Sequence, residues 1–374
     1  MPKNLILLCI ALATWGIGES AFFYFQPLYL EQLGASPVGI GAILGLVGIA
    51  MTITHIPAGY LADRIGRHKL MRLAWLIAAV STWIMVTART LTVFTAGIVI
   101  YGLTSFVMAP LNSYVTAARG NWSVGKAITV ITASYNSGAI IGPLLGGYIG
   151  NHFGIRQIYF FSAIIFILST IVMFNIDDQP VEPREGITAR GLFKNQRYLG
   201  YLVIVFLSMF AMFLPQPLTS NFLQNERGFS LDMIGTIGSI GSLGIVVLSL
   251  IFGRMSARSG YLFSQVSAAA FAFFLWQGTG LPWYALGYFL LGGYRAARAL
   301  TMAQVQTLVC EANMGLAYGV TEAVIGVTVI LAPVLAGYIY THNPINVYTV
   351  SLGLMVLSIF INARYSPNPQ GVKT

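Results

Sequence analysis

The sequence predicts an all-α polytopic membrane protein with twelve transmembrane helices in two six-helix bundles. Three observations carry this prediction. Hydrophobic residues make up 56% of the 374 residues and charged residues only 8%, which leaves too little polar surface for a water-soluble protein of this length. Apolar runs of roughly 20 residues, enough to cross a bilayer as a helix, recur from end to end. Because the runs do not alternate with polar residues, helices are favoured over barrel strands.

The apolar runs define twelve spans in order. They are 4–30, 38–62, 70–89, 92–116, 125–150, 157–176, 198–223, 231–253, 260–279, 282–309, 314–340 and 345–364. The least apolar stretch lies between the sixth and seventh spans and contains Pro180 and Pro183, as expected of a linker. We therefore expect an N-terminal bundle over 1–176, a cytoplasmic linker over 177–197 and a C-terminal bundle over 198–374.

An internal repeat supports this division into halves. Matching segments recur in the same order, 190 or 194 residues apart: 26–28 with 216–218, 34–36 with 228–230, Gly41 with Gly235, and 142–149 with 332–339. Two sets of six spans in the same orientation predict parallel bundles related by a pseudo-twofold axis along the membrane normal.

The positive charge reports orientation rather than a nucleic-acid partner. Net charge is +9, and with the N-terminus placed inside, fifteen of the 20 Lys and Arg residues fall on cytoplasmic segments. Arg89, Arg156 and Arg227 fall outside. The positive-inside rule then places both termini in the cytoplasm of a multi-pass protein of the plasma or inner membrane.

A polar motif joins the second and third spans. It contains Gly59, Asp63, Arg64, Gly66 and Arg67, and a weaker copy begins at Gly253, with Ala257 in place of the aspartate. With the repeat, this motif resembles the major facilitator superfamily across nearly the whole chain. The resemblance implies a central cavity that opens alternately to either side, and a cytoplasmic gate at these five residues, with Asp63 facing the N-terminal end of the eleventh span. The alternative is a solvated basic turn.

A small-residue motif in the fifth span also matches the family. Gly138, Gly142, Pro143, Gly146 and Gly147 resemble the pattern associated with antiporters, which favours export; ordinary helix packing is the alternative. Exporters of this type usually carry an arginine in the fourth span, and here Ile98 takes that position. A proton relay through that span is therefore unsupported.

Four ionisable residues lie inside predicted spans, where charges are costly and usually functional. They are Glu19, Arg295, Arg298 and Glu322. The arginines share one helix face, and if that face lines the cavity they form a clamp suited to a carboxylate or phosphate. A structural ion pair between Arg298 and Glu322 is the alternative. The glutamates are candidate proton carriers, because desolvation favours a neutral carboxyl group and a nearby arginine the charged one.

Polar amides in the spans are further substrate-binding candidates. Gln26 and its repeat counterpart Gln216 can bind substrate from both halves, or can satisfy carbonyls freed by the prolines that follow them. Asn112, with Tyr114, Asn136 and Gln304, is a weaker candidate.

No enzyme, metal or cofactor motif is complete. The segment from Gly120 to Lys126 lacks the hydroxyl residue and the preceding strand of a phosphate-binding loop, and the histidines are scattered. We expect a monomeric secondary transporter, without a cofactor, that exports a small amphipathic or anionic organic solute by proton antiport. The alternatives are proton-coupled uptake of an organic anion and, remotely, lipid scrambling. Its partners are the solute, protons and membrane lipids.

Overall fold

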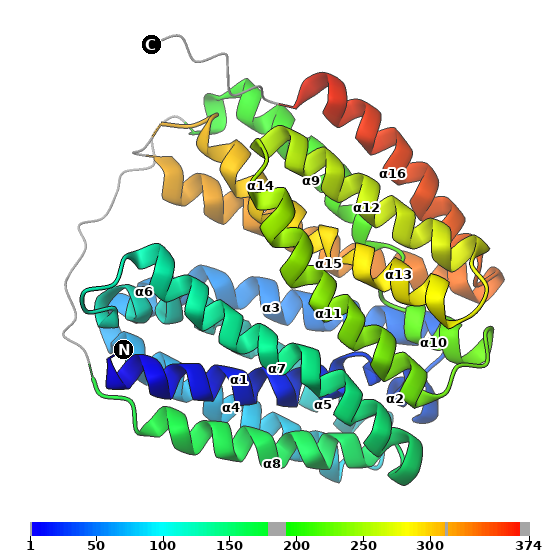
Figure 1. Cartoon of the computed structure of the whole chain (residues 1–374), viewed down its shortest axis with the longest axis horizontal. Helices are drawn as coiled ribbons and strands as arrows, with labels where there is room; N and C mark the ends of the chain where they lie inside the picture. Colours follow the sequence, from blue (N-terminus) through cyan, green and yellow to red (C-terminus); the bar gives the residue numbers. More distant parts are fainter. Residues whose placement is uncertain (1, 179–191, 311–312, 367–374) are drawn as a thin grey trace. The chain divides into compact units, whose positions relative to one another are not determined.

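The computed structural model describes residues 2–178, 192–310 and 313–366, and for residues 55–65 it describes the backbone alone. This described chain is helical and contains no strand (Figure 1). Eleven of its helices are long and apolar enough to cross a membrane. The predicted all-α membrane fold is therefore confirmed.

The helices follow the predicted spans closely. Those of the first six spans are α1 Lys3–Phe23 with α2 Gln26–Gln32, α3 Pro37–Ile65, α4 Arg67–Thr87, α5 Leu91–Gly102 with η1 Leu103–Val107 and α6 Met108–Ala118, α7 Val124–Phe153, and α8 Ile155–Phe174. Those of the last six are α9 Gln196–Phe213 with α10 Thr219–Asn225, α11 Leu231–Gly253, α12 Ala257–Gln277, α13 Leu281–Leu291 with α14 Gly293–Gln306, α15 Met314–His342, and α16 Asn346–Tyr365; the short η2 Leu192–Lys194 precedes α9. The span predicted over 282–309, the tenth in order, is divided at Gly292 into α13 and α14. Counted together as one span, these two helices bring the eleven to twelve.

Two predicted spans are interrupted at equivalent places in the repeat. The first span breaks between α1 and α2, just before Gln26 and Pro27, and the seventh breaks between α9 and α10, around Pro215 and Pro217. Proline has no backbone N–H, so it removes a helical hydrogen bond. The shared Gln-Pro pair therefore lies at the helix interruption in both halves.

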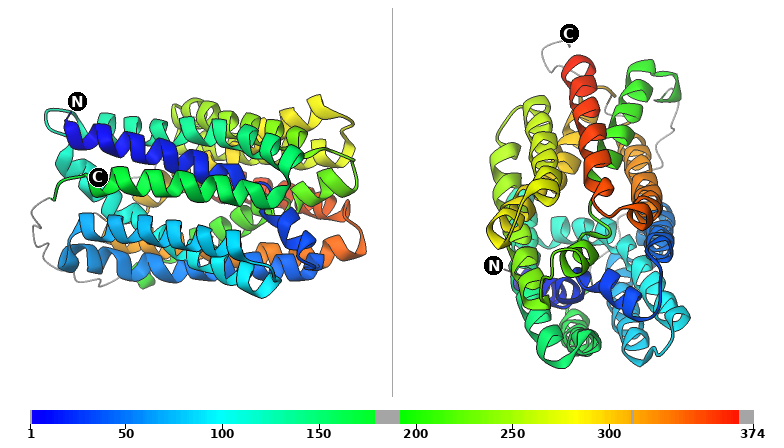
Figure 2. Two further views of the ribbon diagram at one scale, coloured as in Figure 1. Left: turned by 90° about the horizontal axis from the view of Figure 1, so that it is seen from below. Right: turned by 90° about the vertical axis from the view of Figure 1, so that its right-hand side faces the viewer.

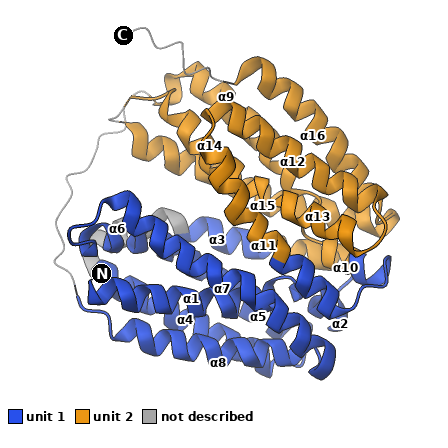
Figure 3. Ribbon diagram, in the orientation of Figure 1, with its two compact units in different colours: residues 1–36, 46–184, 223–239 blue, residues 37–45, 185–222, 240–374 orange. Residues whose placement is uncertain are grey.

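The chain forms two compact units that are not contiguous in sequence (Figure 3). Unit 1 contains residues 1–36, 46–184 and 223–239, and unit 2 contains 37–45, 185–222 and 240–374. In unit 1, α1 packs on α7 and α8, and α4 packs on α8 and α5; in unit 2, α9 packs on α15 and α16, and α12 packs on α16 and α13. Long helices lie alongside one another in both units (Figure 2). These contacts are equivalent under the sequence repeat.

The units are not contiguous because two short segments each belong to the unit formed mainly by the other half of the chain. These segments are residues 37–45, in unit 2, and residues 223–239, in unit 1. Within unit 2, a Cβ added to Gly41 of α3 would lie 2.2 Å from the Pro333 oxygen of α15. Within unit 1, a Cβ added to Gly235 of α11 would lie 2.3 Å from the Pro143 oxygen of α7. Since both glycines and both prolines are repeat counterparts, the sequence repeat is expressed as two equivalent helix crossings.

Candidate functional site

Glu19 of α1 is held by neutral hydrogen-bond donors within unit 1. The Trp15 indole nitrogen donates to Glu19 Oε2 at 3.2 Å, and the Tyr135 hydroxyl of α7 donates to the same oxygen at 2.7 Å. The Tyr101 hydroxyl oxygen of α5 is buried and interacts electrostatically with Glu19 and Tyr135. Three elements thus converge on one half-buried carboxyl group.

Packing fixes the donor ring of Trp15. Its centroid lies 4.5 Å from that of Trp75 and 5.1 Å from that of Phe166, both in edge-on contacts. Among the described residues, no Lys or Arg forms an ion pair with Glu19. The described neighbours that hold the Glu19 carboxyl group are therefore neutral hydrogen-bond donors.

Arg298 of α14 and Glu322 of α15 form an ion pair within unit 2. Arg298 Nε donates to Glu322 Oε1 at 3.3 Å, and a second bond joins Arg298 Nη2 to Glu322 Oε2, so the contact is bidentate. About a third of each side chain is exposed, 34% for Arg298 and 35% for Glu322. The structure thus contains the ion pair that the sequence left as an alternative to substrate binding.

Arg295 differs from Arg298, although it lies one turn earlier on the same helix. Its side chain is exposed, and within the described part of the chain it makes no ion pair. An exposed guanidinium inside a membrane span requires water or a counter-ion beside it. Of the two arginines of the predicted clamp, Arg295 is therefore the one without an ion-pair partner in the described part of the chain.

The candidate amides divide into structural and exposed groups. The Gln216 amide nitrogen donates to the Met212 oxygen at 2.8 Å, which satisfies a carbonyl where α9 ends. Gln304 is buried and bonds to the Ala257 oxygen and to the Ser366 hydroxyl. Gln26 is buried, whereas Asn112 of α6 is exposed. Backbone satisfaction thus accounts for the Gln216 contact.

The small-residue motif of α7 is a packing surface within unit 1. A Cβ added to Gly138, Gly142 or Gly146 would lie 2.1 Å from an atom of α1. One added to Gly147 would lie 2.7 Å from the Leu231 oxygen of α11. The glycines therefore let α7 approach α1 and α11 at backbone distance, beside Pro143.

Only part of the predicted gate motif can be followed. For Gly59, Asp63 and Arg64 the structure describes the backbone alone. Gly66 has φ 100°, a value that L side chains rarely adopt, and it turns the chain from α3 into α4, which Arg67 begins. The predicted contact of Asp63 therefore stays a prediction.

A neighbouring polar cluster escaped the sequence reasoning. His68 Nε2 lies 2.7 Å from Asp178 Oδ1, and Arg72 donates to the Ile176 oxygen at 2.7 Å. These bonds tie the start of α4 to the chain that follows α8. The sequence separation of more than 100 residues hid this pairing, although a histidine beside a basic loop was a visible signal.

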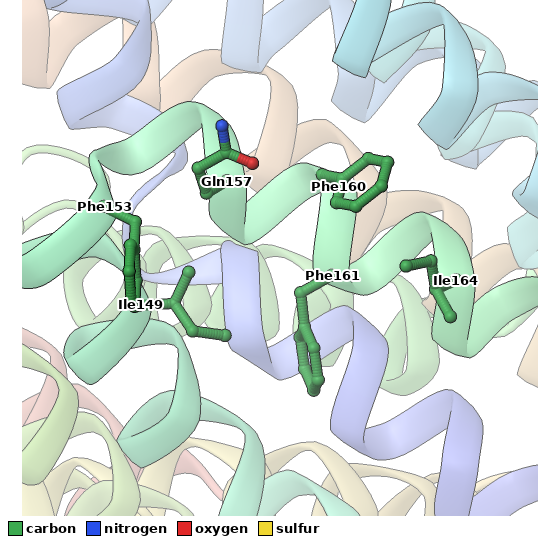
Figure 4. A pocket seen from close by; sticks show the side chains of 6 residues that line it. All are labelled: Ile149, Phe153, Gln157, Phe160, Phe161 and Ile164. Atoms are coloured by element: carbon green, nitrogen blue, oxygen red, sulfur yellow. The ribbon is translucent and has the colours of Figure 1, made fainter.

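Neither a surface groove nor the segment from Gly120 to Lys126 contains a cluster of groups suited to catalysis or cofactor binding. The groove of about 420 Å³ in Figure 4 lies between α7 and α8, and its lining is apolar except for Gln157. In the other segment, Ser123 caps α7 by accepting from the Lys126 amide. No group of three or more His, Cys, Asp or Glu residues in the described ranges has the geometry of a metal site.

Comparison with protein families decides the class of this chain. The model described as Major Facilitator Superfamily matches residues 7–214 and, a second time, 201–374. The chain belongs to the major facilitator superfamily. It is a transporter, not an enzyme, and its double match agrees with the internal repeat.

Curated relatives of this superfamily member include proteins named for multidrug resistance. It is 28% identical over 203 residues to the multidrug resistance protein MdtG of Klebsiella pneumoniae, covering 52% of this chain and 49% of the relative. It is 25% identical over 270 residues to multidrug resistance protein 2 of Bacillus subtilis, covering 68% and 67%. An uncharacterized MFS-type transporter of Methanocaldococcus jannaschii is 26% identical over 175 residues, covering 46% and 45%. The chain spans about half the length of the first and third of these relatives.

Solved structures show the same fold with varied cargo. A mutant of the nucleoside transporter NupG superposes with a TM-score of 0.86 at 17% identity, over 98% of this chain and all of that one. The human organic anion transporter MFSD10 has a TM-score of 0.67 at 18% identity, over 97% and 100%. At these identities the likeness concerns the fold alone.

Proposed function

We propose that this superfamily transporter exports a small organic solute with an anionic or amphipathic character in exchange for protons. The observation that carries the proposal is the unequal state of the two arginines of α14. Arg298 is neutralised by Glu322, whereas Arg295 is exposed and has no acidic partner among the described residues. Arg295 would bind the anionic group of the solute.

Glu19 would carry the proton in this scheme. Its hydrogen bonds come from a tyrosine and a tryptophan, which hold the carboxyl group in place without a permanent counter-charge. Proton uptake and release would therefore change the net charge of its surroundings, as coupling requires. The multidrug resistance relatives support the outward direction.

Proton-coupled uptake of an organic anion is the second candidate. Ile98 of α5, buried at 2% exposure, occupies the position where the resemblance to exporters leads us to expect an arginine. Without that arginine in the fourth span, the antiport scheme of those exporters lacks one of its charged groups, which favours uptake.

Transport in proteoliposomes tests the proposal. Labelled organic anions and amphipathic compounds are screened by counterflow, and the active ones are measured with an imposed pH gradient. Antiport predicts solute accumulation on the acidic side, since protons leave that side as solute enters it. Accumulation on the alkaline side would establish symport instead.

Substitution of Arg295 tests the anion site. Losing one charge-assisted contact costs about 1.5–3 kcal/mol, so Arg295→Ala should weaken anion binding by roughly 10- to 100-fold. Arg295→Lys, which keeps the charge, should lose less. Unchanged affinity for anions in Arg295→Ala would refute this role while leaving the direction of transport open to the gradient experiment.

A further inference from the structure

We propose that a buried polar cluster in unit 2 binds ordered water. The cluster lies among α9, α12, α14 and α16, and Tyr201, Tyr261, Gln265 and Asn362 line the site. Each of these side chains has a buried oxygen that makes no hydrogen bond to any residue the structure describes. Water is the ligand whose chemistry fits these four oxygens.

The two amides supply unpaired acceptors. Gln265 and Asn362 are both 0% exposed. The Gln265 amide nitrogen donates to the Ser358 hydroxyl at 3.0 Å, and that of Asn362 donates to the Ser208 hydroxyl at 2.8 Å. Both amides use their donors in this way, and within the described chain their carbonyl oxygens stay without a donor.

The two tyrosines supply hydroxyl groups beside these acceptors. Tyr261 interacts with Ser208 and Thr301, and Tyr201 interacts with Thr301 and Tyr261, yet neither hydroxyl makes a hydrogen bond of good geometry to a described residue. The Ser208 and Thr301 hydroxyls already donate to the carbonyls of their own helices. The Ser208 and Thr301 hydroxyl oxygens can therefore act only as hydrogen-bond acceptors toward other groups.

The balance of donors and acceptors favours water over a cation. A buried polar atom without a partner is costly, and a buried water commonly makes about three hydrogen bonds to such atoms. A bound water can donate to an amide oxygen and accept from a tyrosine hydroxyl. A cation bound by these neutral oxygens would lack a balancing charge, because no group of three or more His, Cys, Asp or Glu residues is found in the described chain.

Tyr198 provides a matched control on the same helix as Tyr201. It is also 0% exposed, but its hydroxyl donates to the Ala317 oxygen at 2.8 Å. Its hydrogen-bonding needs are met without water. Burial alone therefore does not distinguish Tyr198 from Tyr201 and Tyr261. A water bound beside Tyr201 and Tyr261, and not beside Tyr198, distinguishes them.

Radiolytic footprinting of the full chain in lipid nanodiscs tests the proposal. Hydroxyl radicals formed from a bound water oxidise the side chains that touch it, even where bulk solvent has no access. We expect Tyr201 and Tyr261 to be oxidised several-fold faster than Tyr198, as measured by mass spectrometry. Rates for all three at the level of Tyr198 would overturn the proposal.

Two variants separate bound water from local loosening. Gln265→Met removes one acceptor of the site at similar length, and it should lower the oxidation of Tyr201 and Tyr261 toward the Tyr198 rate. Gln304→Met, whose amide is already paired, should leave those rates unchanged. Labelling that persists in Gln265→Met, or that changes when Na⁺ and K⁺ are replaced by choline, would refute the water site. The comparison within the unmodified chain stands even if a variant fails to fold.

Discussion

At the residue scale, the four ionisable residues of the predicted spans differ in the partners that the structure gives them. Glu322 and Arg298 neutralise each other, Glu19 is held by neutral donors, and Arg295 is exposed. The Trp15 contact was predictable in principle, because residues four apart lie on one helix face. The Tyr135 contact was not, since it joins residues 116 apart in sequence and depends on how closely α7 packs on α1.

The Arg298 ion pair should be replaceable by apolar residues. Arg298→Met leaves Glu322 as an unpaired charge and should lower the free energy of unfolding by about 2 kcal/mol, less than for a fully buried pair because a third of each side chain is exposed. The double variant Arg298→Met with Glu322→Met should recover most of that loss. Thermal unfolding of both proteins measures this. A double variant no more stable than the single one would contradict the assignment as a structural pair.

Glu19 should be needed for coupling but not for folding. Glu19→Gln retains an oxygen that accepts from Tyr135 and Trp15 but cannot exchange a proton. We expect normal expression and thermal stability, retained counterflow, and loss of pH-driven accumulation. Tyr135→Phe, which removes the donor and keeps the carboxyl group, should shift the pH profile of transport rather than abolish it. Full pH-driven accumulation by Glu19→Gln would exclude Glu19 as the proton carrier.

At the element scale, hydrophobic runs located the helices and missed their interruptions. The predicted span 231–253 has the bounds of α11, but the breaks near Tyr24, Pro215 and Gly292 divide three other spans, and η1 interrupts a fourth. Continuous apolar composition carries no signal for such breaks, because both helix segments remain within the membrane. The prolines beside Gln26 and Gln216 were the available signal at two breaks, and the Gly292-Gly293 pair was a weaker one at the third.

The α7 glycines should tolerate no larger side chain. A Cβ at Gly138 would lie 2.1 Å from the Ala13 oxygen, and backbone of α1 cannot move without disturbing its contacts with α8. Gly138→Val should cost about 1–3 kcal/mol or more, as overpacking does. The exposed Gly353 of α16 has nothing within 4 Å, so Gly353→Val is the control. Equal melting temperatures for the two variants in detergent would refute this packing role.

At the scale of the whole molecule, the sequence repeat relates two helix crossings to each other. Gly41 meets Pro333 within unit 2, and Gly235 meets Pro143 within unit 1, each at backbone distance. The sequence indicated that these four residues were counterparts, but it did not indicate that the glycine of one half would pack on the proline of the other. That pairing depends on tertiary packing, which the periodicity and composition of the sequence do not report.

Equivalent crossings should respond equally to substitution. Gly41→Leu and Gly235→Leu each place a side chain against a proline carbonyl 2.2 or 2.3 Å from the new Cβ, so each should separate its pair of helices and reduce counterflow to a similar extent. Neither changes a charged residue, so substrate affinity measured by direct binding should fall less than the transport rate. Gly353→Leu should leave both quantities unchanged. If one crossing variant transports normally while the other is inactive, only one crossing is required for transport, and the repeat is preserved in geometry but not in function.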